Sequence, residues 1–158
     1  MEQTNAALLE LEIVQLSKSD CFELARKEWK LSRIEKQQAL DSCLCGQVIK
    51  ELCYITNQIN GNTVYVGNVC VNKFMQIDTG TMFNGLNRIM KDSTANPSED
   101  LVNHALELGI LKSNEARFLR SLVGRSKLSA KQQNWKKSLN LRMVHSLVVD
   151  ENNRESQT

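Results

Sequence analysis

The sequence predicts an α+β protein, in which a small zinc-binding β-hairpin module of the treble-clef type precedes a helical C-terminal half. Three observations favour this class. Four of the five cysteines lie between residues 43 and 70. The same segment holds two strand-like runs joined by Asn60-Gly61, a dipeptide typical of tight hairpin turns. Beyond Thr79 the apolar residues recur near the helical spacing i, i+3, i+4, i+7.

The N-terminal region contains one segment of undecided structure and one expected helix. Residues 8–16, LLELEIVQL, fit a helix as well as a strand. Ser19 and Asp20 are suitable helix caps, and Glu23 is placed to bond back to the cap. We therefore expect a helix over CFELARKEW.

The next residues predict strands. A short strand is expected over residues 29–34, and EKQQALDS after it has the polar composition of a loop. The hairpin strands are VIKELCYITN and NTVYVGN, and Gly67 interrupts the second of them. One or two helical turns are expected over VCVNKFMQI.

Four helices are expected in the C-terminal half, over TMFNGLNRIMKD, PSEDLVNHALELG, SNEARFLRSLVG and SAKQQNWKKSLNLRMVHSLVVDE. Their start signals are Asn96-Pro97-Ser98, Ser113 and Ser129, and their stop signals are Gly109 and Gly124. The predicted regions are a zinc-binding module at 1–80, a basic helical bundle at 81–150 and a disordered tail at 151–158.

The cysteines have positions that suit a metal. Cys43-Leu44-Cys45-Gly46 forms a tight turn that presents two thiols, and glycine permits the backbone geometry that points amides at sulfur. Cys70 follows Gly67 at the start of a short helix, where the partial positive charge favours a thiolate. Structural zinc takes four such ligands in a tetrahedron.

The fourth ligand is open at this stage. Cys53 is the candidate, and its alternative interpretation is a small core residue on an apolar strand face. Asp41, or a group outside the segment, could replace it, whereas Cys21 is expected to be an ordinary helix residue. The competing hypotheses for the whole set are a redox switch and plain buried thiols.

The sequence does not indicate an enzyme. No histidine lies among the clustered cysteines, and Glu51 is the only acid on the hairpin. His104 and His145 fall in the helical half, at positions typical of helix surfaces. Catalytic zinc usually needs an open position with a proton-transferring side chain nearby, and HxE, GxSxG and phosphate-loop motifs are absent. We expect a non-enzymatic protein.

The expected location is the cytoplasm. No apolar run reaches the roughly 20 residues that span a bilayer, and the N-terminal MEQTNAALLELEIVQL lacks the basic start of a secretory signal. Thiols stay reduced in the cytosol, where clustered cysteines favour metal over disulfides.

Charge is unevenly distributed along the chain. Residues 112–142 carry nine basic side chains against Glu115, a net +8, so the remainder carries −6 of the overall +2. Such a basic segment can attract a phosphate backbone or an acidic protein surface. The plain alternative is a helical bundle with a lysine-rich, solvated exterior. The expected nucleic-acid contacts are Arg120, Arg125, Lys127, Lys131, Trp135, Lys136, Lys137 and Arg142.

Residues 28–75, from EWKL through CLCGQVIKELCYITNQINGNTVYVGNVCVNKFM, resemble a group of small zinc-finger-like proteins of bacteriophages, bacteria and large DNA viruses. These share EW…CxCG…I.N..NG….VG..C…F, and the similarity covers about a third of the chain. In that group His or Lys often follows the CxCG glycine, where this chain has Gln47. The resemblance implies a zinc-binding module and a phage or mobile-element origin, without an established activity.

Two functions follow from these patterns. The first is sequence-nonspecific DNA or RNA binding through phosphate contacts, which give affinity without base readout. A helix-turn-helix around residues 109–124 is a weaker variant, because GILKSNE is a generic connection. The second is a protein-interaction module, an adaptor or inhibitor that docks on a host protein complex through the rigid hairpin and an amphipathic helix.

Overall fold

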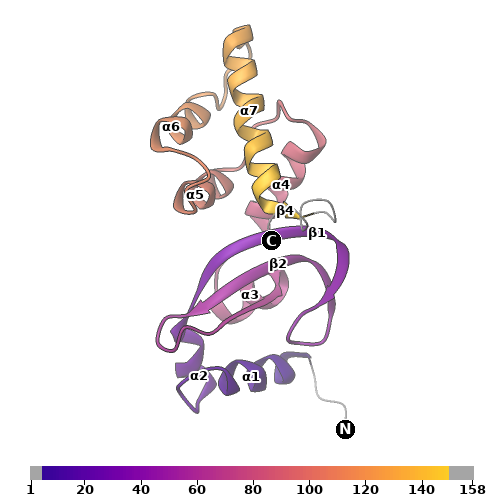
Figure 1. The fold of residues 1–158 in the computed structure, drawn as a ribbon, viewed down its shortest axis with the longest axis vertical. Coiled ribbons are helices and arrows are strands. Elements are labelled where there is room, and N and C mark those ends of the chain that lie inside the picture. The colour runs from indigo at the N-terminus through magenta and orange to yellow at the C-terminus, as the bar shows by residue number, and fades with distance from the viewer. Residues whose placement is uncertain (1–4, 150–158) are drawn as a thin grey trace, which may run out of the picture. The chain divides into compact units, whose positions relative to one another are not determined.

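The computed structural model describes residues 5–149, which divide into two compact units (Figure 1). The first unit comprises the chain up to Thr79 together with Val149, and the second comprises Gly80–Val148. The first unit combines a sheet with helices and the second is helical, so the α+β class is confirmed. The tail predicted at residues 151–158 lies outside the described residues.

The first unit contains three α-helices, one 3-10 helix and most of the sheet. Its helices are α1 (Asn5–Gln15), α2 (Phe22–Ala25), η1 (Arg26–Glu28) and α3 (Asn68–Met75). Its sheet has the strand order β3-β2-β1-β4, where the strands are β1 (Trp29–Ser42), β2 (Val48–Asn57), β3 (Thr63–Gly67) and the two-residue β4 (Val148–Val149).

The undecided segment at residues 8–16 is helical. Leu9 and Ile13, four residues apart, are the buried positions of α1, which is the spacing of one helix face. The alternation of apolar and polar residues in this segment therefore does not mark a strand, because the buried residues follow the helical period.

Strand β1 is longer than the sequence predicts, so the expected polar loop over EKQQALDS is wrong. Antiparallel pairing with β2 runs from Trp29↔Asn57 to Ser42↔Val48. An irregularity between Lys36 and Asp41 absorbs the residues that have no partner on β2. Four of the last five residues of β1 are exposed, as loop residues also are, and Figure 1 shows β1 as a long curved strand beside β2.

The hairpin between β2 and β3 is confirmed, with a longer connection than two residues. Gly61 has φ +79°, the left-handed conformation that glycine adopts readily. The Asn57 Oδ1 atom accepts hydrogen bonds from the amides of Ile59 (2.8 Å) and Asn60 (3.1 Å). The side chain of Asn57 thus organises a five-residue loop before β3 begins at Thr63.

The predicted cap at Ser19 and Asp20 is wrong. Helix α2 starts after Cys21, which makes no side-chain cap bond. The amide of Ser19 instead donates to Glu28 Oε2 (2.9 Å), and the amide of Lys18 donates to Glu28 Oε1 (2.9 Å). The amides before α2 are thus bonded by the carboxylate of Glu28 and not by a local capping box.

The second unit is a bundle of four helices, α4 (Gly80–Lys91), α5 (Glu99–Glu107), α6 (Ser113–Ser121) and α7 (Ala130–Leu147). All four were expected from the periodicity. Ser98 caps α5 and Ser129 caps α7 through their side chains. Gly109 and Gly124 have positive φ values after α5 and α6, as their stop role requires. Among the helices of residues 5–149, none is long and apolar enough to cross a bilayer.

Candidate metal centre

The turn that carries Cys43 and Cys45 lies between β1 and β2. The Cys43 amide donates to the Gln47 carbonyl (2.8 Å), and the Gly46 amide donates to the Cys43 carbonyl (2.9 Å). Gly46 has φ +92°, which a residue with a side chain rarely adopts. The turn is thus closed by backbone bonds, and both thiols are directed to the buried side, where Cys43 is 4% exposed and Cys45 is 1% exposed.

The third thiol comes from the first turn of α3. Gly67 ends β3 and is the residue before the helix, so Cys70 stands at its third position. The Gly67 amide donates to Cys43 Sγ (3.2 Å) and connects the two halves of the site. A Cβ atom on Gly67 would lie 2.9 Å from Ile49 Cγ2, closer than packed side chains allow. Gly67 therefore serves close packing here, besides ending the strand.

Cys43, Cys45 and Cys70 form one cluster, with all three sulfur atoms within 4.8 Å of one another. A zinc ion with bonds of about 2.3 Å places its sulfur ligands about 3.8 Å apart, so small side-chain rotations suffice to bind one ion. Soft thiolate donors in a tetrahedral arrangement favour zinc, Cu(I) or iron. The three cysteines could therefore hold a metal ion.

The protonation of the cluster is uneven. Burial raises the pKa of the Cys43 and Cys70 thiols above their usual range. Burial acts in the same direction on Cys45, but hydrogen bonds from the Gln47 amide and from the Cys70 and Cys43 thiols outweigh it and lower the pKa of Cys45. Cys45 is thus the most readily deprotonated of the three thiols, and a divalent cation would displace protons from the cluster on binding.

The structure does not bring Cys53 into this cluster. Cys53 lies on β2, is 0% exposed, and its Sγ lies 3.9 Å from Thr79 Oγ1. Burial raises the pKa of Cys53 to about 12, so its sulfur is a neutral thiol at pH 7. These are the properties of a small core residue, the alternative interpretation of Cys53.

The other candidate ligands also lie elsewhere. Asp41 Oδ1 accepts hydrogen bonds from the Tyr65 hydroxyl (2.8 Å) and from the Ser42 amide (2.8 Å). Cys21 is exposed and directly precedes α2. Sequence reasoning placed no functional role on Glu51, yet this carboxylate lines the same cavity as the three clustered thiols. Its signal in the sequence was its position as the one acid on the hairpin.

The predicted nucleic-acid residues separate into two groups. One group makes contacts within the second unit. Arg120 Nε lies 3.0 Å from Glu99 Oε1, and Arg142 Nη1 lies 2.8 Å from Glu115 Oε1. Trp135 stacks on Phe118 with ring centroids 3.9 Å apart, so one of its ring faces is covered.

Lys136 belongs to the same group. It is 6% exposed, and burial lowers the pKa of its ammonium, with Asp92 acting in the opposite direction. Arg120 and Arg142 thus make internal ion pairs and Lys136 is buried, while the expectation that all eight residues contact nucleic acid stays a prediction. His104, expected on a helix surface, is buried at 4% exposure.

The second group remains available to a partner. Arg125, Lys127, Lys131 and Lys137 are exposed, and within residues 5–149 none of them makes an ion pair. Arg125 and Lys127 lie in the connection between α6 and α7, and Lys131 lies in the first turn of α7. We call these four side chains the exposed basic group.

Comparison with family models, with curated proteins and with solved structures finds no match to the chain. The geometry of the cysteine cluster and the charges of the second unit are therefore the features that indicate a function.

Proposed function

We propose that the protein is a zinc-stabilised, non-enzymatic nucleic-acid-binding protein. The observation that carries the metal part is the cluster of Cys43, Cys45 and Cys70, which two separate elements bring within 4.8 Å. Bound zinc would link the turn after β1 to the start of α3. Structural zinc sites contribute about 10 kcal/mol of apparent folding free energy at neutral pH, which matches the stability of a whole domain.

The arrangement of the ligands supports a treble-clef-like module. Two thiols come from a tight turn, a hairpin follows, and the third thiol comes from the first turn of a helix. The turn and helix are far apart in sequence, so the metal would close a loop of chain that includes the whole hairpin. Zinc fits better than other soft metals in this role, since it has no redox chemistry.

The nucleic-acid part rests on the exposed basic group. The four exposed cations on the α6–α7 connection and α7 can each meet one phosphate, and contacts of this kind do not read bases. We expect comparable affinity for random DNA and RNA. With four phosphate contacts, affinity falls about 100-fold between 50 and 200 mM salt, because each contact releases a counterion.

The test is a binding titration with random duplex DNA and single-stranded RNA at those two salt concentrations. The variant Lys127→Glu/Lys131→Glu/Lys137→Glu should lose binding, and the matched control Lys18→Glu/Lys27→Glu/Lys30→Glu changes three exposed cations of the first unit by the same charge. Equal losses in the two variants would show a nonspecific charge effect. Normal binding by the first variant would refute the proposed surface.

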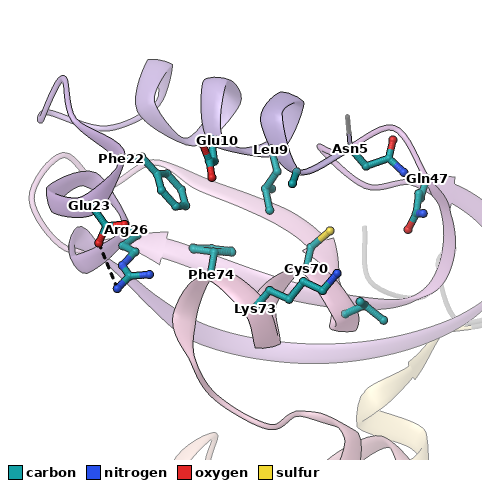
Figure 2. A pocket seen from close by; sticks show the side chains of 12 residues that line it. Asn5, Leu9, Glu10, Phe22, Glu23, Arg26, Gln47, Cys70, Lys73 and Phe74 are labelled. Carbon is teal, nitrogen blue, oxygen red and sulfur yellow. Dashed lines mark ion pairs between the residues drawn. The ribbon is translucent and has the colours of Figure 1, made fainter. Parts of the chain in front are cut away.

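A cavity in the first unit favours the second candidate, a protein-interaction module. This cavity of about 360 Å³ lies between α1, α2 and α3, as Figure 2 shows for Leu9, Phe22 and Phe74. Leu24 and Val69, on α2 and α3, are 59% and 55% exposed. The cavity would admit one large apolar side chain of a partner. Absence of nucleic-acid binding even at 50 mM salt would favour this function over the first.

A further inference from the structure

Three thiols leave a structural zinc ion one ligand short, because such sites are almost always four-coordinate. The fourth donor must lie near Cys43, Cys45 and Cys70 and must have lone pairs not already used. Cys53 and Asp41 do not meet these conditions, since the former lies beside Thr79 and the latter accepts from Tyr65.

Strand β2 places a carboxylate in the cavity beside the cluster, where a side-chain rotation would have to bring it to the three thiols. The period of two along a strand puts Ile49, Glu51 and Cys53 on one face. Ile49 packs against Gly67 and Cys53 lies near Thr79, so this face is the one covered by the chain that follows β3. Glu51 lines a cavity of about 270 Å³ together with Cys43, Cys45 and Cys70.

One oxygen of the half-buried Glu51 carboxylate also lacks a partner, whereas the buried Glu28 and the half-buried Asp41 have theirs. Its Oε2 atom is buried and has no hydrogen-bond partner among residues 5–149. In contrast, Glu28 accepts three hydrogen bonds and Asp41 accepts two. An unsatisfied buried carboxylate oxygen is costly, and in a native protein it points to an absent water or ion.

We infer that Glu51 is the fourth ligand, through a carboxylate oxygen, of a metal ion that Cys43, Cys45 and Cys70 hold. This inference rests on the proposed zinc function and gives the site the donor set Cys₃Glu. Carboxylate oxygen binds zinc at about 2.0–2.2 Å, so a closed four-coordinate site results. The ammonium of Lys50, which is exposed and lines the same cavity, reduces the excess negative charge of the four ligands.

Two other donors of the same cavity are the alternatives that the test must separate. Gln47 is exposed and could offer its amide oxygen, and a water molecule could occupy the fourth position. Neither accounts for the buried, unpartnered oxygen of Glu51 as well as a direct bond to metal does. Carboxylate is also a far commoner zinc ligand than a carboxamide.

The experiment is a Co(II) titration of the full chain under reducing conditions, followed by zinc competition. Wild type should show tetrahedral Co(II) absorption with thiolate charge transfer. Glu51→Gln keeps the shape of the side chain but not its charge, and should keep three-thiolate charge transfer, shift the ligand-field bands and weaken zinc binding at least 10-fold. Changes to residues that only hydrogen-bond a metal ligand already weaken metal binding about 10-fold or more, so loss of a direct ligand should cost at least as much. Gln47→Ala and Cys53→Ser should bind as wild type.

A second measurement does not depend on the folding of any variant. X-ray absorption of the zinc-loaded wild type should show three sulfur ligands and one oxygen or nitrogen ligand. Four sulfurs would overturn the inference and assign Cys53. A Glu51→Gln variant with the affinity and spectrum of wild type would also overturn the inference. In that case metal binding by the wild type would still support the proposed metal function. Failure of the wild type to bind either metal would overturn both.

Discussion

At the scale of one residue, the buried carboxylate of Glu28 joins two separate segments of the first unit. This carboxylate is 6% exposed and accepts hydrogen bonds from the amides of Lys18 and Ser19 and from Asn57 Nδ2. The Lys18 amide, with Asn57 and Ser19, holds the pKa of Glu28 at about 2, below its ordinary value of 4.5. The segment after α1 is thereby joined to the end of β2.

We predict that this group gives the protein a defined acid sensitivity. Because the folded-state pKa is depressed, the stabilisation is fully present above pH 4.5 and is lost as the pH falls toward 2. Glu28→Gln should lower the urea midpoint at pH 7, and the difference from wild type should shrink between pH 5 and pH 2.

The control for this prediction is Glu23→Gln, a change of a carboxylate that is 70% exposed and, among the described residues, pairs with Arg26. It should leave the midpoint close to that of wild type at every pH. A difference between Glu28→Gln and wild type that stays constant from pH 7 to pH 2 would contradict the role given to the charge.

At the scale of elements, α7 carries both the core and the charged surface of the second unit. Leu139, Met143 and Leu147 are buried along it, while Lys131 and Lys137 are exposed. Lys136 lies between these groups and is buried, as Asn140 is on the next turn. A tally of lysines along the sequence gives each the same weight, and only packing distinguishes Lys136 from Lys137.

This difference predicts unequal effects of one substitution at neighbouring positions. Lys136→Glu places a carboxylate in a buried position near Asp92 and should destabilise the second unit by about 2 kcal/mol or more. Lys137→Glu, on the exposed side, should change stability by less than about 0.5 kcal/mol. Urea unfolding followed by circular dichroism measures both, and equal effects would contradict the burial of Lys136.

The same scale shows what the sequence could predict. Helices α4 to α7 and the hairpin were predictable because periodicity, Ser caps, Gly109, Gly124 and Asn60-Gly61 are local signals. The length of β1 and the true start of α2 were not, because both depend on partners distant in sequence, β2 and Glu28. Local composition contains no record of such pairings.

At the scale of the whole molecule, the candidate metal site was likewise predictable where its signals are local in sequence and not where they depend on distant residues. Cys43 and Cys45 were predictable as a pair from their turn, and Cys70 from Gly67 and the helix that follows. The place of Glu51 in the same cavity was not, since it depends on the placement of β2 beside the cluster. The excess of +8 over residues 112–142 likewise does not show that two of these cations form internal ion pairs and that one is buried.

The central claim is that one metal ion organises the first unit. The most direct test is the zinc content per chain of protein purified under reducing conditions without added metal, for wild type, Cys45→Ser and the control Cys21→Ser. We predict one zinc per chain in wild type and in Cys21→Ser, whose sulfur is exposed and outside the cluster. Cys45→Ser should retain little zinc, because a buried thiolate ligand is lost. Wild-type protein without zinc, with all thiols reduced, would contradict the claim.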